Sequence, residues 1–132
     1  MSNSTRRPTV DMAPGAVREV SAAHGGVGVT ALRPLATTQG APFYVLDWEF
    51  PPGTSEGAHH HRDEPIGVEH YVVVRGTVVI VVDGEAHELT AGDAMAIPPH
   101  CVREVRNHFD RPARVLLTVE RLVAADDVLQ DT

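Results

Sequence analysis

The residues with the clearest chemical potential lie in one short stretch, HHHRDEPIGVEH, residues 59–70. In an extended strand, side chains two positions apart share a face, so His59 and His61 should point the same way and His60 the opposite way. Glu69, on the next expected strand, could join them if a hairpin brings it beside His61. Two imidazoles and a carboxylate form a facial ligand set that leaves positions open on a divalent transition metal. The stretch therefore predicts a site for iron, nickel, manganese, copper or zinc.

The surrounding sequence predicts the short strands that would position these ligands. In residues 43–50, apolar and aromatic side chains at alternate positions have the period of two expected when one strand face is buried. Asp83-Gly84 stands between two extended runs and is typical of a two-residue hairpin turn. With 11 glycines and 10 prolines, the chain has enough turn residues to separate many strands. The pattern predicts an all-β sandwich or barrel.

Length and composition limit the organisation of the chain. Its 132 residues are enough for one domain with one core. We expect a flexible N-terminal tail over residues 1–18, a single barrel domain over 19–122 and a C-terminal tail over 123–132. We also expect strand pairing to be interrupted between His61 and Glu69 by a long loop, residues 62–68.

Charge and cysteine content narrow the classes of partner. The formal net charge of -7 argues against a nucleic-acid or anionic-membrane partner, which would require clustered Lys and Arg. A small-molecule partner is expected instead. Cys101 is the only cysteine, so neither an intrachain disulfide nor a cysteine-based zinc site can form. Together with the absence of a long apolar run or an apolar N-terminal stretch, this predicts a cytoplasmic protein.

Two sets of residues resemble the conserved motifs of the cupin superfamily. The first set follows the order Gly53, His59, His61, Glu69 and Gly76, and the second follows the order Gly92, Pro98 and Asn107. The similarity extends over about residues 43–120 and is greatest to small single-domain bacterial cupins of the cupin 2 type, including polyketide-cyclase-like ones. It implies an all-β cupin barrel, a jelly-roll-like double-stranded β-helix, and a homodimer.

The sequence departs from the family pattern at the expected metal site. Arg103 stands where the family has its third histidine ligand, and His100 stands where the family has a glycine. An arginine stays protonated in proteins and cannot bind a metal cation. The four-ligand shell that the resemblance implies is therefore not possible as aligned.

Two main arrangements of these residues remain open. In the first, His59, His61 and Glu69 hold the metal, and Arg103 orients an anionic substrate group through paired hydrogen bonds. In the second, Arg103 forms an ion pair with Glu69 and leaves a metal-free binding pocket.

Other residues could complete or replace parts of this site. His100 or His108 could supply the missing ligand, and Glu64 lies close enough to His61 in sequence to replace Glu69 as the carboxylate ligand. The weaker candidates for the wall of a substrate pocket are Tyr44, Trp48, Tyr71, Glu64 and His100.

The resemblance implies a metal-dependent small-molecule enzyme with oxygenase, isomerase or cyclase chemistry on an oxygenated or aromatic metabolite. Arg103 and Glu69 are then the candidate catalytic residues. The alternative is a non-catalytic small-molecule-binding cupin with an Arg103–Glu69 ion pair and no metal. A third possibility is a subunit that requires another protein for activity.

Overall fold

The computed structural model describes residues 8–12, 17–36 and 40–122, so the expected C-terminal tail and much of the expected N-terminal tail lie outside the described residues. The regular secondary structure of the described residues is strand apart from one short turn, which confirms the all-β prediction. In chain order, the strands are β1 Arg18–Ser21, β2 Val29–Pro34, β3 Phe43–Phe50, β4 Thr54–His59, β5 Ile66–Arg75, β6 Thr77–Val82, β7 Glu85–Thr90, β8 Ala94–Ile97, β9 Arg103–Asn107 and β10 Ala113–Arg121. A short 3-10 turn, η2, covers Ala23–Gly25. Among the described residues, no helix has the length and apolar character needed to cross a membrane.

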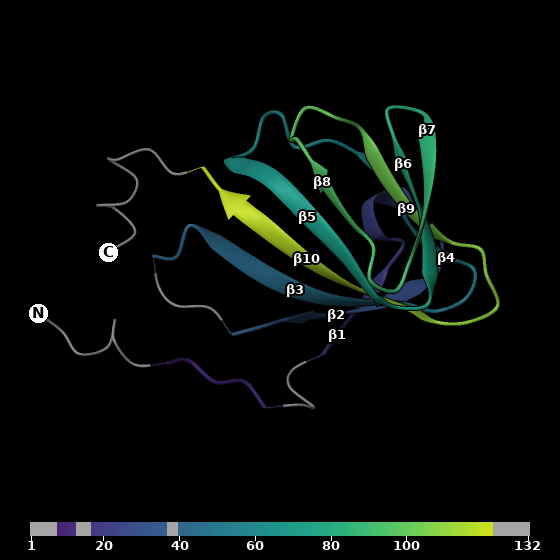
Figure 1. Cartoon of the computed structure of the whole chain (residues 1–132), viewed down its shortest axis with the longest axis horizontal. Coiled ribbons are helices and arrows are strands. Elements are labelled where there is room, and N and C mark those ends of the chain that lie inside the picture. Colours follow the sequence, from purple (N-terminus) through teal and green to yellow (C-terminus); the bar gives the residue numbers. More distant parts are fainter. Residues whose placement is uncertain (1–7, 13–16, 37–39, 123–132) are drawn as a thin grey trace, which may run out of the picture.

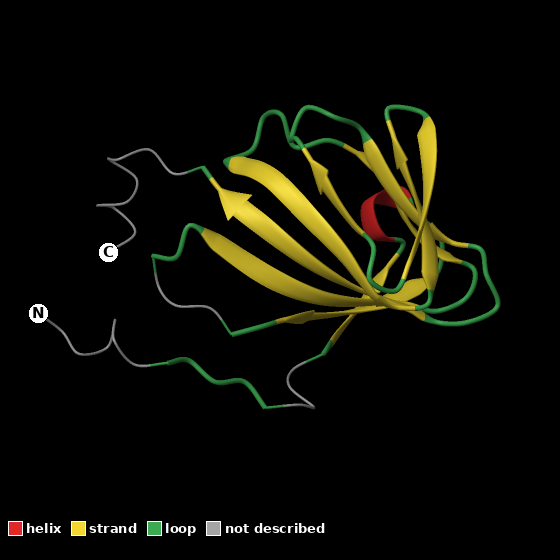
Figure 2. Ribbon diagram, viewed as in Figure 1, coloured by secondary structure: helices red, strands yellow, loops and turns green. Residues whose placement is uncertain are grey.

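The strands form two antiparallel sheets that face each other (Figures 1 and 2). The larger sheet has the order β1-β2-β3-β10-β5-β8, and the smaller sheet has the order β4-β9-β6-β7. Because neighbours in each sheet are often far apart in sequence, the chain crosses repeatedly between the two sheets. This is the jelly-roll-like arrangement expected from the sequence.

Alternation along the strands places one set of side chains between the sheets. In β3, Trp48 and Phe50 are buried and their rings stack with centroids 5.1 Å apart. The indole Nε1–H of Trp48 donates a hydrogen bond to Thr30 Oγ1 at 2.8 Å. Trp48, expected as a pocket residue, thus lies in the core with its one polar atom satisfied. The other fully buried apolar side chains of this core include Val73, Val78, Ile80, Val105 and Ala113.

The connection between β4 and β5 is shorter than the sequence indicated. We expected residues 62–68 to form a loop, but β5 begins at Ile66. Val68 N–H donates a hydrogen bond to the carboxylate of Glu120 at 3.2 Å, and Leu122 N–H donates to Pro65 O at 2.9 Å. Contacts with the end of β10 therefore extend the strand into the expected loop.

The turn η2 packs backbone against backbone on β4. A Cβ atom placed on Gly57 would lie 2.2 Å from the carbonyl oxygen of His24, and one placed on Gly26 would lie 2.1 Å from that of Ser55. Ser55 N–H donates to Val27 O at 2.9 Å, and Val27 N–H donates to Ser55 Oγ at the same distance. The two glycines are required because no side chain fits between these segments. Their close approach fixes His24 beside β4.

Substituting Gly57 by Ala should destabilise the fold by about 1–3 kcal/mol, because the new methyl group would meet rigid backbone and force the turn away from β4. Urea unfolding measures this change. Gly67→Ala is the matched control: the nearest atoms to its Cβ belong to the flexible side chain of Glu120, so this variant should lose little more than the hydrogen bond from Val68 N–H to that carboxylate. Equal losses of stability for the two variants would contradict the proposed role of the backbone contact.

Candidate functional site

Within residues 8–12, 17–36 and 40–122, four acidic or basic side chains are buried. They are Glu56 on β4, His61 in the β4–β5 connection, Glu69 on β5 and Arg103 on β9. Burial of an ionised group is unfavourable unless the group is paired or binds a cation. The partners of these four residues therefore indicate what the interior can do.

Arg103 and Glu69 form a closed ion pair. Arg103 is 0% exposed, and its guanidinium donates to Glu69 Oε1 and Pro98 O through Nη1 and Nη2 and to Cys101 O through Nε at 3.1 Å. Tyr71 also donates its hydroxyl proton to Glu69 Oε1, at 3.2 Å. Burial raises the pKa of Tyr71 well above its usual value, so this phenol stays protonated. All three nitrogens of the guanidinium are thus engaged by the protein itself.

A second cluster forms around Glu56. Its Oε2 accepts a hydrogen bond from His24 Nδ1 at 2.9 Å and lies 3.7 Å from His59 Nε2. The rings of His24 and His59 stack with centroids 3.8 Å apart. One donor atom from each of the three residues lies within 4.8 Å of the other two. These are residue types that bind divalent transition metals.

Two polar atoms of this cluster bear on whether a cation fits there. Glu56 Oε1 is buried and has no hydrogen-bond partner among the described residues. His59 Nδ1 lies 2.8 Å from Gly57 O, and because a carbonyl can only accept, Nδ1 carries the proton. In the neutral ring, the Nε2 lone pair then faces Glu56. The donor set therefore fits a metal ion.

The pKa values of the two histidines in the cluster are shifted in opposite directions. The hydrogen bond to Glu56 raises the pKa of His24 above its usual value. Burial lowers the pKa of His59, which favours the neutral ring required of a ligand. The cluster thus contains one imidazole that burial favours in its neutral form and one that hydrogen-bonds to the carboxylate.

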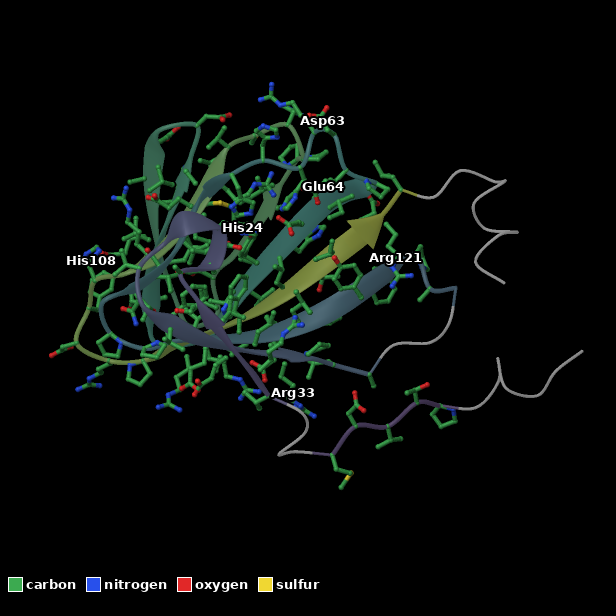
Figure 3. The ribbon with its side chains drawn as sticks, turned by 180° about the vertical axis from the view of Figure 1, so that it is seen from behind. His24, Arg33, Asp63, Glu64, His108 and Arg121 are labelled. Atoms are coloured by element: carbon green, nitrogen blue, oxygen red, sulfur yellow. The ribbon has the colours of Figure 1, made fainter. Side chains whose placement is uncertain are left out.

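His61 lies between the Arg103–Glu69 pair and the Glu56 cluster. Its Nε2 is 3.5 Å from Glu69 Oε1, and its ring centroid is 4.8 Å from that of His59. Its Nδ1 is 3.1 Å from Glu64 Oε1 but has no partner in hydrogen-bond geometry. Glu64 lies on the β4–β5 connection (Figure 3), and its side chain is 51% exposed. Glu64 is therefore the carboxylate of this group that solvent reaches.

The expected ligands lie near one another but do not converge on one point. Among the described residues, one group brings three donor atoms within 4.8 Å of one another, and it consists of His24, Glu56 and His59. His61 and Glu69 do not belong to this group. The residues that sequence reasoning missed are His24 and Glu56.

Strand irregularity explains why Glu56 was missed. Simple alternation places Glu56 and His59 on opposite faces, since they are three positions apart. In the pairing of β4 with β9, however, Glu56 aligns with Val105 and His59 with Arg103, so β4 contains one extra residue between them. This bulge turns both side chains inward.

The other expected pocket residues take different positions. Tyr44 is partly exposed, the Arg121 guanidinium carbon lies 5.3 Å from its ring centroid, and burial raises the pKa of its phenol. His100 is exposed in the β8–β9 connection, where its carbonyl oxygen accepts a hydrogen bond from Arg62 at 3.4 Å. His108 is exposed and stacks on Phe109. Neither His100 nor His108 enters the cluster.

Comparisons with known proteins identify the family. The family model described as "Cupin domain" matches residues 46–119, which is more than half of the chain. This chain therefore belongs to the cupin family. No curated protein sequence matches it significantly.

Several solved structures share the fold. A predicted oxalate decarboxylase from Thermotoga maritima is 21% identical, with a TM-score of 0.73 over 89% of this chain and 96% of that one. A Cupin 2 conserved barrel domain protein from Salinispora arenicola is 25% identical, with a TM-score of 0.62 over 77% and 82% of the two chains. KdgF from Halomonas sp. is 19% identical, with a TM-score of 0.68 over 91% and 97%.

Replacing Arg103 by Met should destabilise the protein by about 3–5 kcal/mol, because the buried Glu69 carboxylate would lose its counter-ion. Adding Glu69→Gln to this variant should restore part of the loss, since no unpaired charge then remains. Urea unfolding of both single variants and of the double variant measures the coupling. Additive effects would contradict the ion pair.

Proposed function

We propose that this chain is a metal-dependent small-molecule enzyme of the cupin type. The observation that carries the proposal is a cluster of three histidines that runs from the buried His61 to the exposed His24. The rings of His24 and His61 lie within 6.3 Å of each other and within 4.8 Å of the ring of His59, and the carboxylates of Glu56 and Glu69 border them. A cluster of so many ionisable groups is unfavourable for the stability of the fold. Such clusters are typical of sites for binding or catalysis.

A divalent metal in this interior would act as a Lewis acid towards an oxygen atom of the substrate or as a redox centre. An oxygenated or aromatic metabolite with an enediol, hydroxy-acid or carbonyl group fits this chemistry, and the reaction classes are oxygenation, isomerisation and cyclisation.

The protein side chains have distinct roles in this proposal. Tyr71 keeps its proton and hydrogen-bonds to Glu69, which Arg103 holds in place. Glu64 and Tyr44, both reachable by solvent, stand where a substrate enters. Arg103 orients Glu69 and the β8–β9 connection, rather than an anionic substrate group, because it has no exposed surface.

A second candidate function is metal-free binding of a small molecule. The Arg103–Glu69 ion pair favours it, since this pair occupies the carboxylate that was expected to bind metal. The two candidates differ in whether the protein requires a metal.

Metal analysis of protein purified without a histidine tag distinguishes these candidates. We expect close to one transition-metal ion per chain, and we expect turnover of a panel of hydroxy acids, enediols and catechols only with the metal-loaded protein. No metal after reconstitution with Fe(II), Mn(II), Ni(II), Cu(II) and Zn(II) would exclude the enzyme proposal and favour metal-free binding.

Metal removal should also lower the stability of the fold. At a free metal concentration of about 100 times Kd, binding to the native state adds about 2.7 kcal/mol. Thermal unfolding with and without a chelator measures this difference. Magnesium serves as the control, because imidazole-rich sites bind it weakly; stabilisation by magnesium equal to that by zinc would contradict a histidine site.

A further inference from the structure

We propose that the metal ligands of this chain are His24, Glu56 and His59, and not the expected set of His59, His61 and Glu69. This inference rests on the proposed function, because it takes metal binding as given and assigns the residues. The class of ligand is a first-row divalent ion that favours imidazole, such as Fe(II), Co(II), Ni(II) or Zn(II). One ligand then comes from the N-terminal turn η2 rather than from a barrel strand.

The first argument is distance. One donor atom from each of the three residues lies within 4.8 Å of the others. Imidazole and carboxylate ligands bind such ions at about 2.0–2.2 Å, so two donors on one ion are at most about 4.4 Å apart. A contraction of a few tenths of an ångström brings all three into the coordination shell.

The second argument is the unsatisfied carboxylate. Glu56 is 2% exposed, and its Oε1 has no hydrogen-bond partner among the described residues. Its Oε2 lies 3.7 Å from the Nε2 of His59, whose lone pair points outward because Nδ1 is bound to Gly57 O. Oε2 already accepts a hydrogen bond from His24 Nδ1, so Oε1 is the oxygen that a bound cation would satisfy. The cluster thus contains one buried carboxylate oxygen for which the described part of the protein supplies no donor.

The third argument concerns the competing carboxylate. Glu69 Oε1 already accepts hydrogen bonds from Arg103 and Tyr71. The buried guanidinium would repel a metal ion bound to the same carboxylate, and it leaves no net negative charge there to attract one. Glu56 has no such cation against it except a protonated His24.

The fourth argument is backbone strain at the proposed third ligand. His24 has φ of 48°, and Ala22, two residues earlier, has φ of 50°. Non-glycine residues in this left-handed region are disfavoured, and such strain concentrates at functional sites. The close contact of Gly26 and Gly57 maintains this conformation and places the His24 ring on that of His59. The turn therefore holds the His24 ring against the ring of His59 in a backbone conformation that non-glycine residues seldom adopt.

The test is titration of metal-stripped, untagged, full-length protein with Co(II), followed by calorimetry and by the visible absorption of the bound ion. We expect His24→Ala and Glu56→Gln each to weaken Co(II) binding by more than about 10-fold. Glu69→Gln is matched to Glu56→Gln as a second buried carboxylate; its amide oxygen can still accept from Arg103 and Tyr71, and we expect its Co(II) affinity to fall by less than about 3-fold provided that circular dichroism shows the native fold. His60→Ala, an exposed neighbour of His59, is the surface control and should have no effect.

Each outcome separates this assignment from the proposed function. If Glu69→Gln weakens binding and His24→Ala does not, the ligand assignment is overturned while metal dependence stands. If the unmodified protein binds neither Co(II) nor Zn(II), both the assignment and the proposed enzyme are overturned. Circular dichroism checks folding; because the side chain of His24 is 48% exposed, His24→Ala should fold and decides the question even if Glu56→Gln does not.

Discussion

The chemistry of this barrel depends on one buried cation, the Arg103 guanidinium. Because it has no exposed surface, its charge has to be balanced inside the protein. Glu69 supplies the opposite charge and accepts one hydrogen bond from Arg103. The carbonyl groups of Pro98 and Cys101 accept two further hydrogen bonds from the guanidinium. The pair links β9 to β5, one strand from each sheet, and fixes the connection between β8 and β9. It also neutralises the carboxylate on that side of the interior.

The opposite side of the interior depends on an irregular strand. The extra residue in β4 turns Glu56 and His59 inward together, and the absence of a side chain at Gly57 lets the turn η2 approach closely. His24 reaches the cluster only because both conditions hold. A regular β4 would have directed Glu56 to solvent and left His59 and His61 as the inward ligands. The bulge and the glycine contact therefore decide which donors meet.

These same features separate what could be predicted from the sequence from what could not. The alternation in residues 43–50 and the Asp83-Gly84 turn are local signals, and they were sufficient for the all-β fold and its antiparallel pairing. The prediction that a hairpin would bring Glu69 beside His61 was wrong in its cause, because β4 pairs with β9 and β5 pairs with β10 and β8, in different sheets. His61 and Glu69 come close because the two sheets face each other. The bulge and the contact of His24 with Glu56 depend on pairing between segments distant in sequence, and no local pattern records such pairing.

The charges of the interior connect these two sides. With neutral histidines, Glu56, Glu69 and Arg103 leave one net negative charge buried, and that charge resides on Glu56. A proton on His24 balances it, which is why the hydrogen bond to Glu56 raises the pKa of His24. A metal ion would balance the same charge but requires His24 to be deprotonated, so the proton and the metal compete for one position. Arg103 stands in place of a histidine ligand and neutralises Glu69. Glu56 is therefore the carboxylate that attracts a cation more strongly.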